Sequence, residues 1–576
     1  MKKNLLLLGL AAIAMVVWLP SVLSAQTPPA GPSDILIASG VVTNAQGKPV
    51  KEVQVHPLVN GKKLELKEEI LTSQDGRYVL RLVLPPGTLP EAKISLEACK
   101  PAYANSGEIR LDRVVKEGED HQGNQVYLAN RDVKMARAVT PAFWIASLVL
   151  VGVYVLIALE LMHRTLAAFL GASLLLVITY TAGTFNPDYV ILTYEDAVRA
   201  IDMNVILLLM AMMIIVGVLK RTGVFQWMAY KSFQLARGNV FALSAVLMVV
   251  TAVTSAFLDN VTTMLLIIPV TIEIALTLKI DPVTLLMPEV FASNVGGTAT
   301  LIGDPPNIMI GSYAKLSFLD FVQNLTFICV ICLIFTVVYF LYWYRKEYAR
   351  AKVGDVQALL KHLREEYRIT DKTLLIQGGL ILGVTVFLFI IHGALHMEPS
   401  IAAMIGAAVL LAVSRTNIVE ILEHEIEWPT LIFFMMLFIV VAGAEETGLI
   451  QTIADWVNVV SQGSLVVAIL MILWVSAVAS AIVDNIPFTA TMLPISAYLT
   501  TTIPGAEGGI LWWALALGAC LGGNGTMIGA SANVVTVGMA ERAGHPISFL
   551  HYMKVAVIPT IVTIVLASLW LLFVEI

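Results

Sequence analysis

The sequence predicts a polytopic α-helical membrane protein with a small exported β-sandwich at its N-terminus, and three observations lead to this prediction. Of the 576 residues, 58% are hydrophobic and only 14% are charged, whereas a soluble domain carries about 25% charged residues. Apolar segments follow one another from about Phe143 to the C-terminus, and such a chain needs a bilayer as its solvent. Residues 34–130 are instead polar and carry strand and turn signals.

The N-terminus has the layout of an export signal. Residues 1–25 contain two lysines, then an apolar run over residues 5–19, and then small residues at a cleavage-like site. They are expected to be a signal peptide or an uncleaved anchor. Residues 26–33 are rich in proline and form a linker to the next domain.

Residues 34–130 are expected to form a β-sandwich outside the cytoplasm. Val53-Gln54-Val55 alternates, and Asp75-Gly76 is a hairpin turn signal before another alternating run. The stretches SGVVTNAQGKPV, LTSQDGRYVLRL and LPPGT resemble the carboxypeptidase-regulatory-like β-sandwich. This resemblance implies a scaffold or an adhesive unit.

The apolar segments after residue 140 are expected to be helices of the cell (inner) membrane, because they do not alternate as barrel strands do. Basic residues gather in the loops 220–238 and 345–372, which the positive-inside rule makes cytoplasmic. The acidic loop 184–204 suits the outer side. The acidic loop 414–428 must face inward in this scheme, although acidic residues weigh little in the rule.

Composition and motifs exclude several function classes. The net charge of −6 comes without a block of basic residues, which excludes a nucleic-acid partner. The sequence lacks the G-x-x-x-x-G-K-[ST] pattern of an ATP site, which excludes a pump of that class. The chain is therefore not expected to be an enzyme, or to use ATP or any cofactor beyond a coupling ion, Na⁺ or H⁺.

The chain repeats itself, which divides it into a first repeat over residues 140–345, a cytoplasmic loop over 346–373 and a second repeat over 374–576. Chance similarity between apolar helices does not explain polar residues and glycines at a fixed offset. Pairs that lie 225 positions apart are Thr222-Gly223 with Thr447-Gly448, Asp259-Asn260 with Asp484-Asn485, and Pro269 with Pro494. Pairs that lie 226 apart are Gly296-Gly297 with Gly522-Gly523, Thr300 with Thr526, Gly303 with Gly529, and Asn307 with Asn533.

The number of crossings decides how the repeats are related. If segments 239–257 and 261–278 each cross the membrane, a repeat has six spans and the halves are parallel. If they form a re-entrant hairpin, a repeat has five spans and the second half is inverted. The two basic loops fall on one side only with the hairpin. The sequence thus predicts inverted five-span repeats with two re-entrant hairpins, an architecture of many secondary transporters.

Each repeat also contains a helix that cannot continue. ASNVGGTATLIGDPPNIMI over residues 292–310 and the second copy LGGNGTMIGASAN combine glycines with polar residues. Unwound carbonyls there would bind cations; alternatively, the glycines only permit close helix packing. The candidate cation- and substrate-binding residues are Asp259, Asn260, Thr262, Asn294, Gly296, Gly297, Thr298, Asp304, Asn307, Asp484, Asn485, Thr489, Gly522, Gly523, Asn524, Thr526 and Asn533.

A Na⁺ ion is expected at Asn260 and at Asn485, together with backbone carbonyls near Gly296 and Gly522. The hairpin-tip aspartates have two interpretations. Each either binds Na⁺ or takes up a proton, because a bare carboxylate in a membrane is costly, or it caps the helix that follows. The same alternatives hold for Asp304.

These residues resemble the ion transporter superfamily, which includes arsenite and sodium/proton permeases, dicarboxylate/sodium symporters and the P protein group. The block ASNVGGTATLIGDPPN is most similar to the P protein group, and the resemblance covers residues 140–576. It implies a homodimer and an elevator-type movement. The symporters carry Ser-Asn-Thr at both hairpin tips; here Asp259-Asn260-Val261 and Asp484-Asn485-Ile486 retain only the asparagine.

The sequence therefore predicts a secondary active transporter that moves a small ion or an anionic solute, coupled to Na⁺ or H⁺. Two alternatives stay open: a Na⁺/H⁺ antiporter, and an ion channel or a sensor that uses the exported β-domain. Arsenite, a carboxylate, chloride and Na⁺ against H⁺ are the solutes left open.

Overall fold

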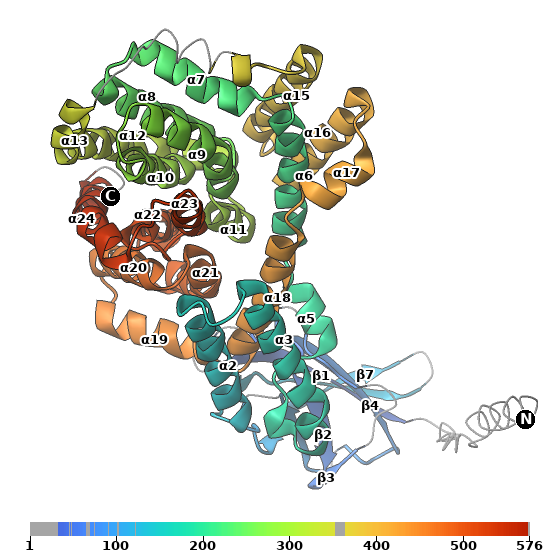
Figure 1. Cartoon of the computed structure of the whole chain (residues 1–576). Helices are drawn as coiled ribbons and strands as arrows, with labels where there is room; N and C mark the ends of the chain where they lie inside the picture. The colour runs from blue at the N-terminus through green and yellow to red at the C-terminus, as the bar shows by residue number, and fades with distance from the viewer. Residues whose placement is uncertain are drawn as a thin grey trace, which may run out of the picture. The chain divides into compact units, whose positions relative to one another are not determined.

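The computed structural model describes residues 33–573, apart from positions 45–46, 48, 65–68, 74, 90–91, 101–102, 121–122, 352–362 and 364. The expected signal peptide or anchor, and all but the last residue of the expected linker, lie outside the described residues. The chain divides after Ala138 into two compact units, one of strands and one of helices (Figure 1).

The first unit consists of two β-sheets that share one apolar core. Leu36 and Leu80 from one sheet and Leu96 and Ala98 from the other belong to the same buried cluster. The first sheet has the order β4-β1-β8-β7 with β9 also on β1, and the second has the order β3-β2-β5-β6. The strands are β1 (Asp34–Asn44), β2 (Gln54–Val59), β3 (Lys62–Lys63), β4 (Arg77–Leu84), β5 (Ile94–Cys99), β6 (Ile109–Arg110), β7 (Val114–Glu119), β8 (Gln125–Asn130) and β9 (Val133–Met135).

Strand β4 shows why this region folds as sheets. Its side chains alternate strictly between exposed and buried, so that Tyr78, Leu80 and Leu82 enter the core. Gly76, in the turn before β4, has φ +72°, a conformation that glycine adopts without strain. The β-region continues past residue 130, because β9 pairs in parallel with the end of β1.

The second unit is helical, as the lack of alternation predicts. Among the described residues, nine helices are long and apolar enough to cross a membrane. The helices before residue 352 are α2 (Pro141–Ala158), α3 (Arg164–Tyr180), α4 (Ala182–Phe185), α5 (Tyr194–Ala200), α6 (Met203–Lys220), α7 (Val224–Ala236), α8 (Val240–Ser255), α9 (Asn260–Thr277), α10 (Val283–Thr298), α11 (Pro305–Ala314), α12 (Phe318–Trp343) and α13 (Arg345–Arg350).

The later helices repeat this order. They are α15 (Lys372–Ile391), α16 (Pro399–Ser414), α17 (Ile418–His424), α18 (Trp428–Glu446), α19 (Leu449–Ser461), α20 (Leu465–Ile482), α21 (Asn485–Thr502), α22 (Ile510–Gly522), α23 (Ser531–Arg542) and α24 (Phe549–Phe573). Short 3₁₀ turns lie at η1 (Pro187–Tyr189), η2 (Ala506–Gly508) and η3 (Gly523–Gly525).

These helices pack as two groups that each draw on both repeats. We call α2, α3, α6, α15, α16 and α18 the scaffold group, because α6 packs on α16 and α3 packs on α18. We call α8 to α12 and α20 to α24 the core group, in which α8 packs on α10, α20 packs on α22, and α10 contacts α22 and α23 (Figure 1). Each repeat therefore contributes helices to both groups.

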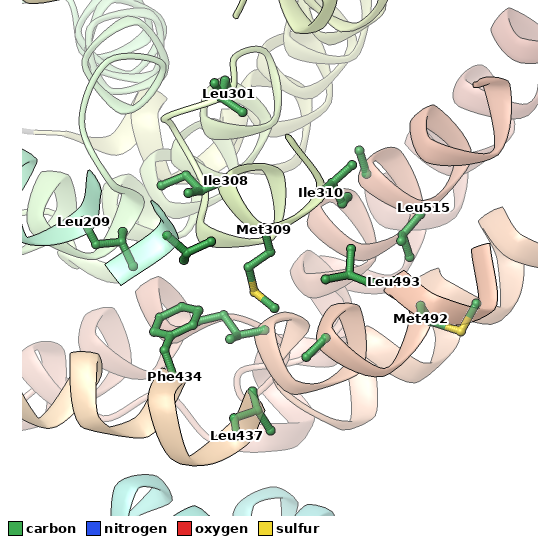
Figure 2. Packing of buried hydrophobic residues seen from close by; sticks show 14 of the residues in the cluster. Leu209, Leu301, Ile308, Met309, Ile310, Phe434, Leu437, Met492, Leu493 and Leu515 are labelled. Carbon is green, nitrogen blue, oxygen red and sulfur yellow. The ribbon is translucent and has the colours of Figure 1, made fainter. Parts of the chain in front are cut away.

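The contact between the groups is mostly apolar. Figure 2 shows Ile308 and Met309 of α11 on the side of Leu209 of α6 and Phe434 of α18, whereas Ile310 lies on the side of Leu493 and Leu515. These side chains are buried. Such a surface has no direction-specific bonds, so it does not fix one position of the two groups as a hydrogen-bonded surface would.

The helical structure stops at both glycine-containing segments. Helix α10 ends at Thr298 and α11 begins at Pro305, while α22 ends at Gly522 and α23 begins at Ser531. Proline provides a good first helical residue for α11, because its missing N–H would be unpaired there in any case. The connections between α8 and α9 and between α20 and α21 are shorter and end at Asp259 and Asp484.

The glycines at the breaks also permit close packing between helices, as the second interpretation of these glycines predicts. A Cβ atom on Gly296 would lie 2.1 Å from the carbonyl oxygen of Ala252 in α8, and one on Gly522 would lie 2.4 Å from Cα of Ala477 in α20. Backbone cannot give way as a flexible side chain can. The two repeats therefore use glycine for the same steric reason.

We expect Gly296→Ala and Gly522→Ala each to lower the thermal stability of the purified chain, because overpacking a core costs about 1–3 kcal/mol. Gly379→Ala in α15 is the control, since no atom lies within 4 Å of its Cβ position. Thermal unfolding in detergent measures the change. Equal stability of all three variants would contradict the packing argument.

Candidate functional site

Asp259, in the turn between α8 and α9, and Asp484, in the turn between α20 and α21, cap the helices that follow them. We call each of these helix pairs a hairpin and its turn the tip. The Asp259 carboxylate accepts from the backbone N–H groups of Val261 at 2.8 Å and Thr262 at 3.2 Å. The Asp484 carboxylate accepts from the backbone N–H of Ile486 at 3.2 Å. Both aspartates therefore cap a helix, as one of the two interpretations predicts. It leaves carboxylate oxygens available for other contacts, because a cap uses only part of the acceptor capacity.

Asn294, which is buried in α10, joins the two repeats. Its Nδ2 donates to Oδ1 of Asn524 at 2.8 Å and to Oδ1 of Asn533 at 2.9 Å. Its Oδ1 accepts from Nδ2 of Asn260 at 3.2 Å. All four asparagines are nearly or fully buried. Four of the predicted site residues therefore form one network at the contact between the breaks.

One asparagine closes each break. Nδ2 of Asn307 donates to the carbonyl oxygens of Thr298 at 3.0 Å and Thr300 at 2.8 Å. Nδ2 of Asn533 donates in the same way to Gly523 at 2.8 Å and Thr526 at 2.9 Å. These side chains replace the helical N–H groups that the carbonyls lose where the helix stops.

Hydroxyl groups connect each break to its hairpin. Oγ1 of Thr300 donates to the carbonyl of Ala256, and Oγ1 of Thr526 donates to that of Ala481, both at 2.5 Å. The donors are 226 positions apart and the acceptors 225 apart, as in the sequence repeat. The repetition therefore extends from the sequence to individual hydrogen bonds.

The other predicted residues lie around this network in different roles. Asp304 is buried and accepts from Nδ2 of Asn485 at 3.4 Å on both oxygens, which joins one break to the opposite hairpin tip. The hydroxyls of Thr298 and Thr489 donate to carbonyls one turn earlier in their own helices. The side chains of these two threonines therefore bond within their own helices.

At the predicted Na⁺ sites, the groups expected to bind the ion form hydrogen bonds within the protein. The carbonyl of Gly296 accepts from the N–H of Ala299 at 3.1 Å, and both tip asparagines donate through Nδ2. Among the described residues, no three His, Cys, Asp or Glu side chains converge as metal ligands would. Na⁺ binding at Asn260 and Asn485 stays a prediction.

A cavity between the two groups collects the charged residues. It is lined by Asp259, Asp304, Glu427 and Arg164, together with both tip asparagines. A larger pocket of about 640 Å³ lies next to it and is lined by Arg164, Glu427 and Asp484. Carboxylates outnumber the one arginine around these two cavities, which makes them attractive to cations.

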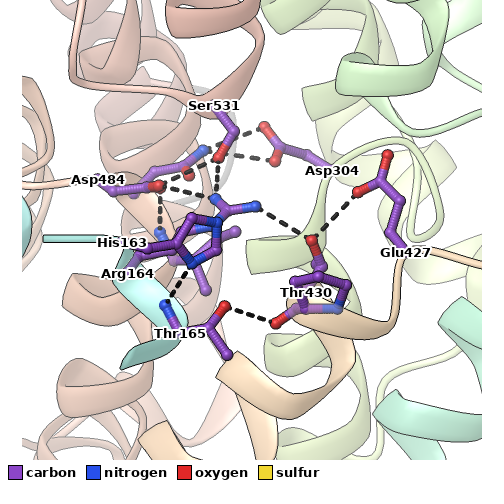
Figure 3. Close-up of polar contacts among 11 residues, drawn as sticks. His163, Arg164, Thr165, Asp304, Glu427, Thr430, Asp484 and Ser531 are labelled. Carbon is purple, nitrogen blue, oxygen red and sulfur yellow. Dashed lines mark hydrogen bonds and ion pairs between the residues drawn. The ribbon is translucent and has the colours of Figure 1, made fainter. Parts of the chain in front are cut away.

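The sequence did not predict the residues that the scaffold group contributes to this cavity. Figure 3 shows Arg164 of α3 directed at Asp484, with Nη1 3.3 Å from Oδ2. Nη2 of Arg164 donates to Oγ1 of Thr430 at 3.2 Å, and Oγ1 of Thr430 donates to Glu427 at 3.1 Å. Arg164 stands at the edge of an apolar segment, where a basic residue is typical of a membrane flank. Only the tertiary structure brings it to the tip.

The helical unit is similar to known transporters. A family model described as citrate transporter matches residues 154–518. An uncharacterized transporter of Mycobacterium tuberculosis is 42% identical over 433 residues, which are 74% of this chain and 97% of the relative. The 46 kDa membrane protein of Mycobacterium leprae is 40% identical over 430 residues, with 74% and 97% covered.

The P protein of Homo sapiens is 36% identical over 485 residues, which are 71% of this chain and 57% of that protein. Among solved structures, a 3-chlorocatechol 1,2-dioxygenase from Rhodococcus opacus has 15% identity and a TM-score of 0.15 over 18% of this chain and 61% of that chain. This last likeness is too low to carry an argument. The transporter relatives agree with the resemblance that the sequence blocks indicated.

We expect Asn307→Asp and Asn533→Asp to destabilise the chain, because each removes the N–H donors from two buried carbonyls, and each unsatisfied group costs about 1–3 kcal/mol. Asn324→Asp is the control, since its Nδ2 donates to the Asp320 carbonyl, which is 2.7 Å away and lies within the unbroken helix α12. The temperature of thermal unfolding should fall clearly more for Asn307→Asp and Asn533→Asp than for Asn324→Asp. A similar fall in the control would contradict the closing role.

Proposed function

The chain belongs to the citrate transporter family, and from this premise we propose that it is a secondary active transporter of a small ion or an anionic solute, coupled to Na⁺ or H⁺. The observation that carries the proposal is the meeting of two duplicated helix breaks at the buried asparagines. Backbone that leaves a helix at membrane depth is tolerated where it is buried or lines an aqueous cavity, and in transporters it binds the transported ions.

The two helix groups support an elevator-type movement. The core group holds both breaks and both hairpins, and it meets the scaffold group largely through apolar side chains. Polar contacts across this boundary among the described residues include the Tyr154 hydroxyl on the Pro487 carbonyl at 2.6 Å, near one tip, and Nδ2 of Asn204 on Oγ of Ser312 at 3.0 Å, away from the tips. We infer that the core group slides as one body against the scaffold group. We also infer a homodimer, as the resemblance to the family implies.

The excess of carboxylates supports coupling to a cation. An anion that entered this cavity alone would meet Asp259, Asp304 and Glu427 against one arginine. Accompanying cations or protons would neutralise these groups and permit entry. The same excess favours the second candidate, a Na⁺/H⁺ antiporter, in which the carboxylates alternate between the two cations and no anion moves.

The ion pairs at the end of α6 support the inward position of the acidic loop 414–428. Lys220 lies 3.1 Å from Glu425, and Arg221 lies 3.1 Å from Glu420. The basic and acidic loops therefore lie at the same end of the helices. We infer that the basic loops are cytoplasmic, that the two repeats are inverted five-span units, and that the N-terminal β-domain lies outside the cytoplasm.

Flux in proteoliposomes tests the proposal. The purified full chain should take up citrate, arsenite, chloride or Na⁺ in a saturable manner, with Na⁺ and pH gradients imposed separately. We expect uptake of one of these solutes to stop when the driving gradient is collapsed. Uptake of Na⁺ against H⁺ with no anion would support the antiporter. A gradient-independent current would indicate a channel, and no flux at all would leave a sensor.

The tip aspartates can be tested in the same vesicles. Asp259→Asn keeps the cap, because asparagine is an equally good N-cap residue, but it removes the charge that a coupling cation needs. We expect gradient-driven accumulation to fall at least about tenfold, the loss expected when a charged partner worth 1.4 kcal/mol or more disappears. Asp188→Asn, in the exposed turn before α5, is the control. Normal accumulation in Asp259→Asn would leave only the capping role.

The topology has its own test. A protease added to intact spheroplasts should remove the β-domain over residues 34–130, while the loop 345–372 should be cut only in inverted vesicles. The physical reason is that the basic loops resist translocation. Protection of the β-domain in spheroplasts would overturn this orientation without bearing on transport.

A further inference from the structure

The hydrogen bond between Arg164 and Asp484 is weaker than an arginine–carboxylate pair can be. Its guanidinium reaches Asp484 through one nitrogen only, Nη1, at 3.3 Å. A carboxylate that pairs well with arginine makes two parallel hydrogen bonds at about 2.7–2.9 Å. Asp484 is not positioned to do so, because its other oxygen caps α21 at the N–H of Ile486.

The surroundings fix the guanidinium in position. Its Cζ lies 5.3 Å from the centre of the Phe433 ring, which favours a cation above the ring face. The hydroxyl of Ser531 lies 2.5 Å from Nη1 and donates to Asp484 at 3.1 Å, so it connects the two charges. Thr430 accepts from the other nitrogen, Nη2. The hydroxyls of Ser531 and Thr430 thus both accept hydrogen bonds from the guanidinium.

The pocket beside Arg164 has the size for a small organic anion that enters together with cations, because Glu160, Glu427 and Asp484 also line it and outnumber the arginine. Its volume of about 640 Å³ lies in the range of ligand pockets. Beside the charged residues, Ile157, Met162 and Val534 line its walls with apolar side chains. A molecule with a carboxylate and a carbon skeleton would find both a charge partner and an apolar surface there.

The two hairpin tips differ at this point. Asp484 has Arg164 and Ser531 as partners, whereas the position equivalent to Ser531 in the first repeat is Pro305, which has no hydroxyl. Among the described residues, Arg164 forms its ion pair with Asp484, and Asp259 forms no ion pair. The two repeats therefore differ at their tips, because Arg164 of the scaffold group pairs with Asp484 in the second repeat.

We propose that Arg164, with Ser531 and Thr430, binds a carboxylate of the transported solute, and that Asp484 is an internal competitor which occupies the arginine when no solute is present. The solute carboxylate offers two free oxygens and displaces Asp484 from the guanidinium. Because Arg164 belongs to the scaffold group and Ser531 to the core group, the bound anion bridges the two groups. This inference rests on the proposed transport function and assigns the residues that hold the carboxylate of the solute.

Equilibrium binding of radiolabelled citrate and succinate to the full chain in detergent tests the proposal. Removal of the arginine and removal of its competitor should change affinity in opposite directions. Arg164→Gln should weaken binding at least about tenfold, as expected for the loss of charge-assisted hydrogen bonds. Asp484→Asn, which keeps the cap, should bind several-fold more tightly. Arg164→Lys should lie between Arg164→Gln and the parent, because an ammonium keeps the charge without the planar fork.

Arg221→Gln is the matched control, because the Arg221 side chain is 25% exposed against 23% for Arg164 and is also paired with glutamates of another segment. It should bind citrate and succinate like the parent. Thermal unfolding verifies that each variant is folded. A merely structural ion pair would make Arg164→Gln and Asp484→Asn weaken binding together, and that result would overturn the proposal.

Unchanged binding in Arg164→Gln, or no saturable binding of either carboxylate to the parent, would also overturn it. The flux assay separates these failures from a failure of the transport function. A parent chain that transports arsenite, chloride or Na⁺ but binds neither carboxylate would retain the proposed function and lose only the carboxylate site.

Discussion

The structure depends on one constraint: a helix that stops where water is excluded must pair its exposed backbone groups within the protein. Here asparagine amides supply those partners. Asn307 and Asn533 each donate to two carbonyls across a break, and Asn294 connects the two breaks through its own amide. An amide can donate and accept at once, which explains why asparagine, rather than serine or threonine, stands at the centre of both copies.

The same constraint determines what surrounds the breaks. The unwound backbone leaves little room, so glycine is needed where Gly296 meets α8 and where Gly522 meets α20. The polar groups satisfy one another inside the core group, and apolar side chains are left for its boundary with the scaffold group. A polar interior and a largely apolar boundary agree with the sliding movement proposed above, because apolar contacts can exchange without the loss of directional bonds.

Charge is distributed unevenly over this arrangement. The acidic side chains are shared between the tips, the break before α11 and the scaffold group, whereas the scaffold group supplies the one arginine at the cavity. Among the described residues, Arg164 forms an ion pair with one tip aspartate, Asp484, so two tips that are alike in sequence have different charged partners. Opposite charges in adjoining positions let a transporter bind a cation and an anion near each other, since each reduces the repulsion that the other would meet alone.

The sequence by itself determined the class of the protein and the residues at the breaks. Composition required a bilayer, and polar pairs at a fixed offset identified both tips and both breaks, because buried polar residues are costly and therefore stand out against apolar helices. Only the tertiary structure decided how these residues pair. That Asn294 bonds across the repeats and that Arg164 reaches Asp484 depend on contacts between segments hundreds of residues apart. Spacing along a chain carries no information about such distances.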